Sequence, residues 1–478
     1  MERHRALSIN LKDALIAFGV SLLCGVLIVR YNLLIIPIIA GIILFLLSLC
    51  KYEFIFYLGI SSFVFYNLAI IHFGSFDGKP YQIIWSMVFI AYTLKSLYHR
   101  EQVLKFDKID IPLFTLLAAY MLSLINSINS GITLKETIQL FYFILTFKII
   151  CASIKNKKEM IRVFHLVIIF GLIFIGIGLL TVFIGRAPFP QLVVDMSRKK
   201  ISLNTHGILF QEAMRSVGRA IFTRVSSCFI DYVATANISC QILIILLVLI
   251  GGKHLGVQKK VLLSLAFLLG GILLIFTFSR AGMTTFILSA MLVMYFRKQF
   301  KSILIFLLVL ISVIIFYQPL KVRMKEAGTL EQHSTRGHLA LYWAACNIFL
   351  RSPLHGIGAG TFKELDKSPL AKDAKKKFNV WGWPDAHNMF LQCAAETGII
   401  GLISLISIIG IYFHSLIKAI RIQEDSYYRD LLIGLTLANF CAVLMNLTMN
   451  AFGVDTFWVI AGVGYAAASL AHPSPNIK

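Results

Sequence analysis

The chain has 478 residues, of which 58% are hydrophobic and only 14% are charged. Because an average soluble protein carries ~25% charged residues, so little charge cannot cover the surface of a soluble globule. The composition excludes a soluble enzyme, a disordered chain and a coiled coil, and it predicts an all-α polytopic membrane protein. A transmembrane β-barrel is also excluded, because its strands would alternate apolar and polar residues, whereas long apolar runs recur here.

Basic residues outnumber acidic ones by 45 to 23, which gives a formal net charge of +22. In a membrane protein such an excess is typical of cytoplasmic loops, so a nucleic-acid partner is not expected. The eight cysteines are scattered, mostly in apolar runs and without metal-ligand spacing. Neither a disulfide framework nor a metal site is therefore predicted.

About fourteen apolar runs follow one another, and each approaches the ~20 residues that cross ~30 Å of hydrocarbon. The first follows a basic N-terminus but has no small-x-small cleavage site, so it is interpreted as a retained span rather than a signal peptide. We expect about 12–14 transmembrane helices. The runs cover residues 13–29, 33–50, 54–71, 81–98, 111–129, 134–153, 161–185, 230–250, 261–278, 281–297, 302–318, 389–417, 430–449 and 455–471.

The connecting loops predict how the chain is threaded. With both termini in the cytoplasm, every inside loop is basic, as the positive-inside rule requires. Two long loops then lie outside, and the second is expected to contain short surface helices. The predicted parts are N-terminal transmembrane helices (1–185), a basic outside loop (186–229), further transmembrane helices (230–318), a large outside loop (319–388) and C-terminal transmembrane helices (389–478).

Both outside loops are basic, with a net charge of +5 each. Long loops cross the membrane regardless of charge, so the run Lys375–Lys377 can equally be a solvated face or an anchor to anionic headgroups. Arginines close to span ends are different, because each is costly unless it is paired. Since Arg forms bidentate hydrogen bonds with phosphate, a phosphorylated lipid at the outer face is the expected partner.

Three arginines carry this hypothesis. Arg280 lies in the short Phe278–Gly282 turn between two apolar runs, although it could simply be a snorkelling interface arginine. Arg224 enters the eighth run, where Asp231 could pair with it and neutralise it. Arg336 begins an amphipathic run, predicted to be a helix along the membrane surface, whose N-terminal end favours anions.

A histidine at the start of a later run is the candidate general base. His387 follows Asp385 and precedes Asn388, at the outer end of the run that begins near residue 389. Beside arginines, such a histidine could take a proton from a reacting hydroxyl, although an isolated histidine is more often structural. Trp381 and Trp383 precede it, either as interface anchors or as a stacking platform for sugar rings.

These residues resemble the O-antigen ligase and polymerase superfamily. The resemblance covers about 220–405, where four elements occur in order, and the half before it matches only as a stack of spans. The upstream motif of the family often has Pro-Asn where this chain has Asp231-Tyr232. The four elements are Arg224…Phe229…Asp231, Ser279-Arg280-Ala281-Gly282, Arg336…Trp343…Ser352-Pro353…Gly356-Ile357-Gly358, and His387-Asn388 followed by Gly398 and Gly401.

The resemblance implies a glycosyltransferase of the fold typical for lipid-linked sugar donors, in the bacterial inner membrane, with its active site facing the periplasm. The donor would be a glycan on undecaprenyl pyrophosphate, and the acceptor a sugar hydroxyl of lipid A-core for a ligase, or a second lipid-linked repeat unit for a polymerase. It implies transfer with inversion and with neither a metal nor another cofactor. Neither outside loop carries an Asp-x-Asp or clustered carboxylates.

The residue roles predicted on this basis are catalysis for His387 and Arg336, and binding of the donor diphosphate for Arg224 and Arg280. Candidate contacts to the glycan or acceptor are Trp343, Trp381, Trp383 and Asn388.

Two other classes remain as alternatives. A transporter would use buried charges such as Lys148, Asp430 or Asp455 to line a path near mid-bilayer. A passive scaffold for glycan assembly would tolerate loss of His387, whereas the enzyme would not.

Overall fold

The computed structural model describes the chain in fifteen segments, and three of the predicted runs (13–29, 33–50 and 302–318) lie outside them apart from residues 46–47. Arg224, Trp381 and Trp383 also lie outside the described residues. The segments are 46–47, 51–62, 69–73, 76–100, 104, 106–184, 191–195, 200–204, 214–217, 220–223, 227, 232–298, 333–379, 385–449 and 455–471.

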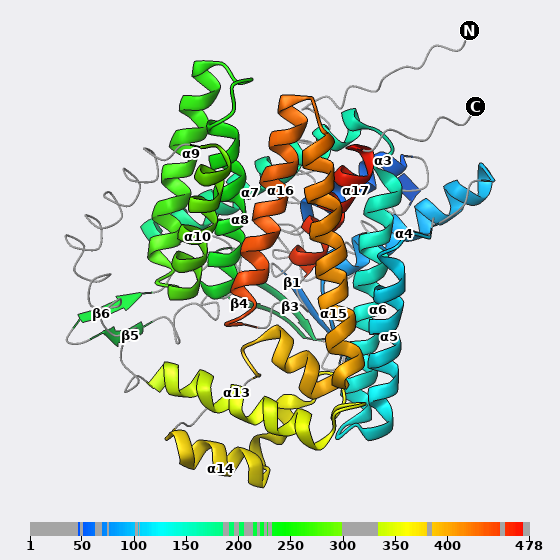
Figure 1. Ribbon diagram of the computed structural model, residues 1–478, viewed down its shortest axis with the longest axis vertical. Helices are drawn as coiled ribbons and strands as arrows, with labels where there is room; N and C mark the ends of the chain where they lie inside the picture. The colour runs from blue at the N-terminus through cyan, green and yellow to red at the C-terminus, as the bar shows by residue number, and fades with distance from the viewer. Residues whose placement is uncertain are drawn as a thin grey trace.

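The described chain is mainly helical (Figure 1). Its helices are α3 (Tyr52–Ser62), α4 (Pro80–Tyr98), α5 (Asp110–Leu122), η2 (Ser123–Asn126), α6 (Ser130–Ser153), α7 (Lys157–Ile184), α8 (Tyr232–Ile250), α9 (Val257–Phe276), α10 (Arg280–Phe296), α13 (His333–Arg351), η3 (Phe362–Lys367), α14 (Pro369–Phe378), α15 (Met389–Ile422), α16 (Ser426–Met445) and α17 (Asp455–Ala471).

Six of the described helices are long and apolar enough to cross a membrane, namely α6, α7, α8, α9, α15 and α16. Shorter apolar helices in the described part are α10, the Phe457–Ala471 part of α17, and α5 together with η2 (Asp110–Asn126). Each predicted run within the described residues contains one of these helices or α3 or α4. The prediction of a helical, multi-pass membrane protein is therefore confirmed.

Short strands occur between the helices and were not predicted. In the described part, β1 (Ala69–Phe73), β2 (Phe76–Gly78), β3 (Gln191–Asp195) and β4 (Lys200–Asn204) form a sheet of order β2-β1-β3-β4, with β1 parallel to β3. A separate antiparallel hairpin joins β5 (Met214–Val217) and β6 (Ala220–Thr223). The apolar run 54–71 has the composition of one span, but α3 ends at Ser62 and the end of the run pairs with a segment more than a hundred residues away.

One end of the helix bundle is covered by α13 and α14, and we call it the α13 end (Figure 1). Two hydrogen bonds tie it together. The Tyr342 hydroxyl on α13 donates to the Leu447 carbonyl after α16 at 2.7 Å, and the Met389 N–H of α15 donates to the Asn446 carbonyl at 2.9 Å. The start of α15 and the end of α16 therefore lie together against α13.

The opposite end gathers the segments that the sequence predicts as basic inside loops. Arg297 donates to the Asp430 carboxylate and to the Gly251 carbonyl, each at 2.7 Å, which joins α10, α16 and the segment after α8. Lys157 donates to Gln423 at 3.3 Å and joins α7 to the end of α15. The ends of α8, α10 and α15 and the starts of α7 and α16 are thus joined by these contacts.

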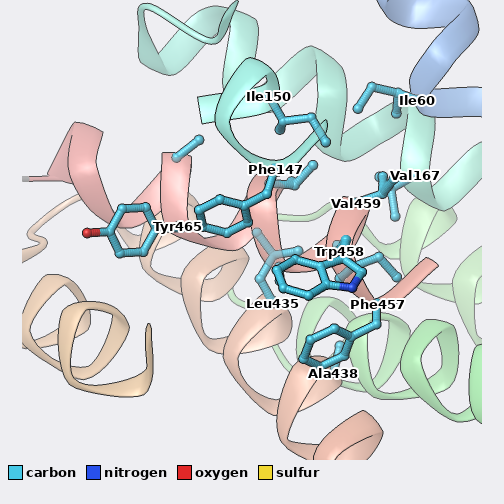
Figure 2. Close-up of a cluster of buried hydrophobic side chains, with 14 of the residues drawn as sticks. Ile60, Phe147, Ile150, Val167, Leu435, Ala438, Phe457, Trp458, Val459 and Tyr465 are labelled. Atoms are coloured by element: carbon cyan, nitrogen blue, oxygen red, sulfur yellow. The ribbon is translucent and has the colours of Figure 1, made fainter. Parts of the chain in front are cut away.

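Helix α17 packs in the centre of the bundle, where Trp458 and its neighbours form a buried cluster (Figure 2). The Trp458 side chain is 1% exposed and stacks on Phe143 of α6 with 6.1 Å between ring centroids. A Cβ at Gly462 would lie 3.2 Å from Ile150, so α6 and α17 approach closely. Small residues are typical of such membrane helix interfaces, because they allow backbones to pack together.

Candidate functional site

The first turn of α15 is built around Asn388. Its side-chain oxygen accepts hydrogen bonds from the N–H groups of Phe390 (3.0 Å) and Leu391 (3.1 Å), which is an N-cap. Its amide nitrogen donates to the Leu447 carbonyl at 3.2 Å. Asn388 thus fixes where α15 begins and ties it to the end of α16. The predicted contact between Asn388 and a glycan remains a prediction.

His387 precedes this cap in a left-handed conformation, with φ of 47°. Such a conformation costs a residue with a Cβ roughly 1–2 kcal/mol, so something must hold it. The Asp385 carboxylate does so, because one oxygen accepts from the backbone N–H of His387 at 2.8 Å and lies 2.6 Å from Nδ1 of its ring. The turn thereby aims the imidazole and fixes its orientation.

The Asp385–His387 contact also fixes which ring nitrogen carries the hydrogen. Burial raises the pKa of the Asp385 carboxyl, but the hydrogen bonds and positive charge of His387 outweigh burial and lower it overall. Asp385 is therefore a carboxylate at neutral pH and accepts the Nδ1 hydrogen of His387. Nε2 of neutral His387 is left as a proton acceptor, as in a histidine oriented by a carboxylate.

A second histidine lies against the first. The rings of His338 on α13 and His387 are 5.0 Å apart between centroids and tilted by 46°. Burial lowers the pKa of His338 to about 4, and the positive charges of Arg280 and of His387 in its protonated form act in the same direction. His338 is therefore neutral near pH 7, and Arg280 belongs to the same electrostatic cluster.

Arg280 is the first residue of α10, directly after the connection from α9. The Ser279 hydroxyl caps the helix by accepting from the Gly282 N–H at 3.2 Å. A Cβ at Gly282 would lie 2.7 Å from the Ala236 side chain of α8, so the glycine lets α10 approach α8 closely. This packing holds the half-buried Arg280 near His338 at the α13 end.

Arg336 and Trp343 both lie on α13. Arg336 is half-buried in the first turn of the helix, two residues before His338. Trp343 packs against Phe378 of α14 at 6.3 Å between ring centroids, and the Lys377 ammonium lies 4.8 Å above its ring. The geometry gives Trp343 a packing role between α13 and α14, and its contact with a glycan stays a prediction.

The predicted helix around Arg336 is confirmed, but the surface that it packs against the protein is not the apolar stripe that makes the run amphipathic. That stripe consists of Leu339, Tyr342, Trp343, Cys346, Phe349 and Leu350. Leu339, Cys346 and Leu350 of that stripe are exposed, and small residues such as Ala340 and Ala344 are buried instead. Alanines allow α13 to lie close to α14 and α15, whose Ala374 and Ala395 belong to the same cluster.

The loop after α13 is fastened to α15 by the buried side chain of Glu396. Its carboxylate accepts from the N–H groups of Gly360 (2.9 Å) and Phe362 (3.1 Å), and from Gln392 at 3.1 Å. The Gln392 oxygen accepts in turn from the Ala386 N–H at 3.1 Å. One hydrogen-bonded chain therefore supports both the loop after α13 and the segment that carries His387.

Glycines make this contact sterically feasible. Gly356 has a φ of 67°, and a Cβ there would lie 2.2 Å from the Glu396 backbone carbon. Gly398, with a φ of 70° within α15, would clash in the same way with the Leu354 carbonyl at 2.3 Å. The loop glycines therefore form a turn packed on α15.

The structure brings His387, Arg280 and α13 with Arg336 to the same end of the bundle. Sequence reasoning did not assign roles to His338, Asp385 or Glu396. The Asp-x-His spacing is the signal for Asp385, because an aspartate can accept a hydrogen bond from the N–H two residues later. His338 has no comparable local signal, since its neighbour His387 is 49 positions away.

Comparison with known families gives one match in this region. Residues 265–406 match the family model described as O-Antigen ligase. The matched range contains Arg280, Arg336, His338, Asp385 and His387, whereas Arg224 lies before it. A search of curated proteins finds no match. The family match confirms the resemblance to the O-antigen ligase superfamily inferred from the motifs.

Proposed function

We propose that the chain, whose residues 265–406 match the O-antigen ligase family model, is a ligase that transfers an undecaprenyl-pyrophosphate-linked glycan to lipid A-core. The acceptor atom is a sugar hydroxyl, and the site faces the periplasm from the bacterial inner membrane. The single observation that carries the mechanism is the Asp385–His387 pair beside His338 and Arg280, where a proton acceptor and a cation meet.

The base in this mechanism is His387. Asp385 holds hydrogen on Nδ1, so Nε2 takes the proton of the acceptor hydroxyl as its oxygen attacks the anomeric carbon. A positioned base of this kind contributes ~10²–10⁴-fold to a rate. The imidazolium that forms is stabilised by the Asp385 carboxylate and later releases the proton to water. Direct attack inverts the anomeric centre.

The leaving group is the lipid diphosphate. The bond between the anomeric carbon and the diphosphate oxygen breaks, and its electron pair stays on that oxygen. Preorganised cations stabilise the charge that develops there. We assign this role to Arg224 and Arg280, with Arg336 approaching the same group from α13. Guanidinium groups suit a diphosphate because each presents several donors in a fixed plane.

A polymerase would use the same donor chemistry with a second lipid-linked repeat unit as acceptor. The two proposals differ only in the acceptor, so an acceptor exchange separates them. Purified protein in vesicles is given the lipid-linked glycan with either lipid A-core or excess donor alone. A ligase forms glycosylated lipid A-core and leaves repeat units unjoined in its absence. Formation of longer lipid-linked glycan from donor alone would instead support the polymerase.

The positions of the charged residues that a transporter would need along its path favour the enzyme over a transporter. Lys148 pairs with Asp110 at 2.6 Å, and Asp430 pairs with Arg297 at 2.7 Å. Both pairs lie near helix ends at the end of the bundle opposite α13, rather than along a path at mid-bilayer. The Asp455 side chain lies outside the described part of the structure.

A further inference from the structure

We infer that His338 is a further catalytic residue, a neutral imidazole that donates a hydrogen bond from Nε2 to the diphosphate oxygen leaving the anomeric carbon. This inference rests on the proposed glycan transfer. It adds to that reaction a hydrogen-bond donor that does not change its protonation state. It separates the roles of the two adjacent histidines, because His387 takes a proton and His338 keeps its own.

His338 lies where the two halves of the reaction meet. Its ring is 5.0 Å from that of His387 and 6.1 Å from that of Tyr342 on the next turn of α13, measured between centroids. The charge of Arg280 also acts on it. A group close to the proton acceptor and under the influence of a cation proposed to bind phosphate is placed to act on the leaving oxygen.

The surroundings keep His338 uncharged. Burial is the largest influence and lowers its pKa to about 4, and the positive charges of Arg280 and of His387 once it has taken up a proton act in the same direction. The Asp385 carboxylate acts in the opposite direction but does not outweigh them. A neutral imidazole carries one N–H and one bare nitrogen, so it can donate without competing for the proton that His387 accepts.

The buried side of the ring indicates which nitrogen carries the hydrogen. Nδ1 of His338 is buried and has no hydrogen-bond partner among the described residues. A buried N–H without an acceptor is rarer in proteins than an unsatisfied acceptor, so the hydrogen belongs on Nε2. The ring therefore offers an N–H donor from its other side.

Such a donor acts where charge develops. As the bond to the anomeric carbon breaks, its electron pair moves to the diphosphate oxygen, and a fixed N–H strengthens its hydrogen bond to that oxygen. The His338 hydrogen stays on the imidazole, and the only proton transferred goes from the acceptor hydroxyl to His387. Loss of one preorganised donor of this kind lowers kcat by ~10²–10³-fold.

Two substitutions separate this role from packing. His338→Phe keeps an aromatic ring against His387 and Tyr342 but removes the N–H, so kcat should fall ~10²–10³-fold with little change in KM. His338→Gln keeps a neutral N–H donor and should stay within about tenfold of the natural protein. His99→Phe, an exposed histidine after α4 at the opposite end, is the matched control and should not change kcat.

The measurement is release of undecaprenyl diphosphate by purified protein as a function of donor concentration and pH. His338→Gln should keep the loss of rate at low pH, because His387 causes it. Near-normal kcat in His338→Phe, equal losses in the Phe and Gln variants, or disappearance of that pH dependence in His338→Gln would each overturn the inference. If His338→Phe does not fold, His338→Leu makes the same comparison. Absence of release by the natural protein would contradict the proposed function itself.

Discussion

Replacing Asp385 with asparagine tests the arrangement that makes His387 a base. Asparagine keeps an oxygen that can accept from the His387 backbone N–H, so the left-handed turn should survive. It also brings an amide N–H that can donate to Nδ1, which moves the ring hydrogen to Nε2. His387 would then present a donor where the acceptor hydroxyl needs a proton acceptor.

The expected loss follows from the role of the base. General base catalysis contributes ~10²–10⁴-fold, so Asp385→Asn should lower kcat by up to that factor, or about 2.7–5.5 kcal/mol of barrier. Donor KM should change little, since the arginines stay in place.

Asp385 also links folding stability to pH. Its pKa is lowered in the folded protein, so its contribution to stability is present above its unfolded value of ~3.9 and is lost as the pH falls through the folded value. Melting temperatures of the natural protein and Asp385→Asn should therefore converge at acid pH.

The assay is release of undecaprenyl diphosphate by purified protein across pH 5–9. Asp366→Asn is a matched control, because Asp366 pairs with Lys375 on the exposed surface of α14 and a surface pair contributes only ~0–1 kcal/mol. If Asp385→Asn kept normal kcat while folding normally, the argument that Asp385 sets the His387 tautomer would be refuted.

Two further predictions concern the diphosphate. Arg280→Ala and Arg336→Ala should each abolish most transfer while leaving the protein folded in the membrane, and lysine should restore little because it lacks the planar fork; full activity of both lysine variants would show that charge alone suffices. Transfer should persist in excess EDTA, because guanidinium groups balance the diphosphate charge, and a loss that Mg²⁺ reverses would reveal a metal requirement.

The sequence predicts the spans well where composition alone decides them. The run predicted from residue 389 begins one residue after the Asn388 cap, and α15 likewise starts at Met389. The run 54–71 shows the limit of the same reasoning. Its end lies in strand β1, Ala69–Phe73, which forms because β3 supplies a partner. The sequence of one segment does not reveal a partner so distant in the chain.

The site is predicted only in part, for a similar reason. His387, Arg280 and Arg336 stand out because charged residues at span ends are unusual. The carboxylate beside His387 can be inferred from its spacing, but the ring of His338 cannot, since α13 meets the start of α15 only after folding. Glu396 is a polar residue within an apolar run, and its partners on the loop after α13 become visible only in the structure.

The most direct test of the whole account is the turnover and donor binding of His387→Gln. Glutamine keeps a hydrogen-bonding group but cannot take up a proton, so turnover should fall ~10²–10⁴-fold while the lipid-linked donor still binds through the arginines. The residual rate should also lose the decline at low pH that protonation of His387 causes in the natural protein. Near-normal turnover of His387→Gln with the same pH profile would contradict the account, because His387 would then not be the base.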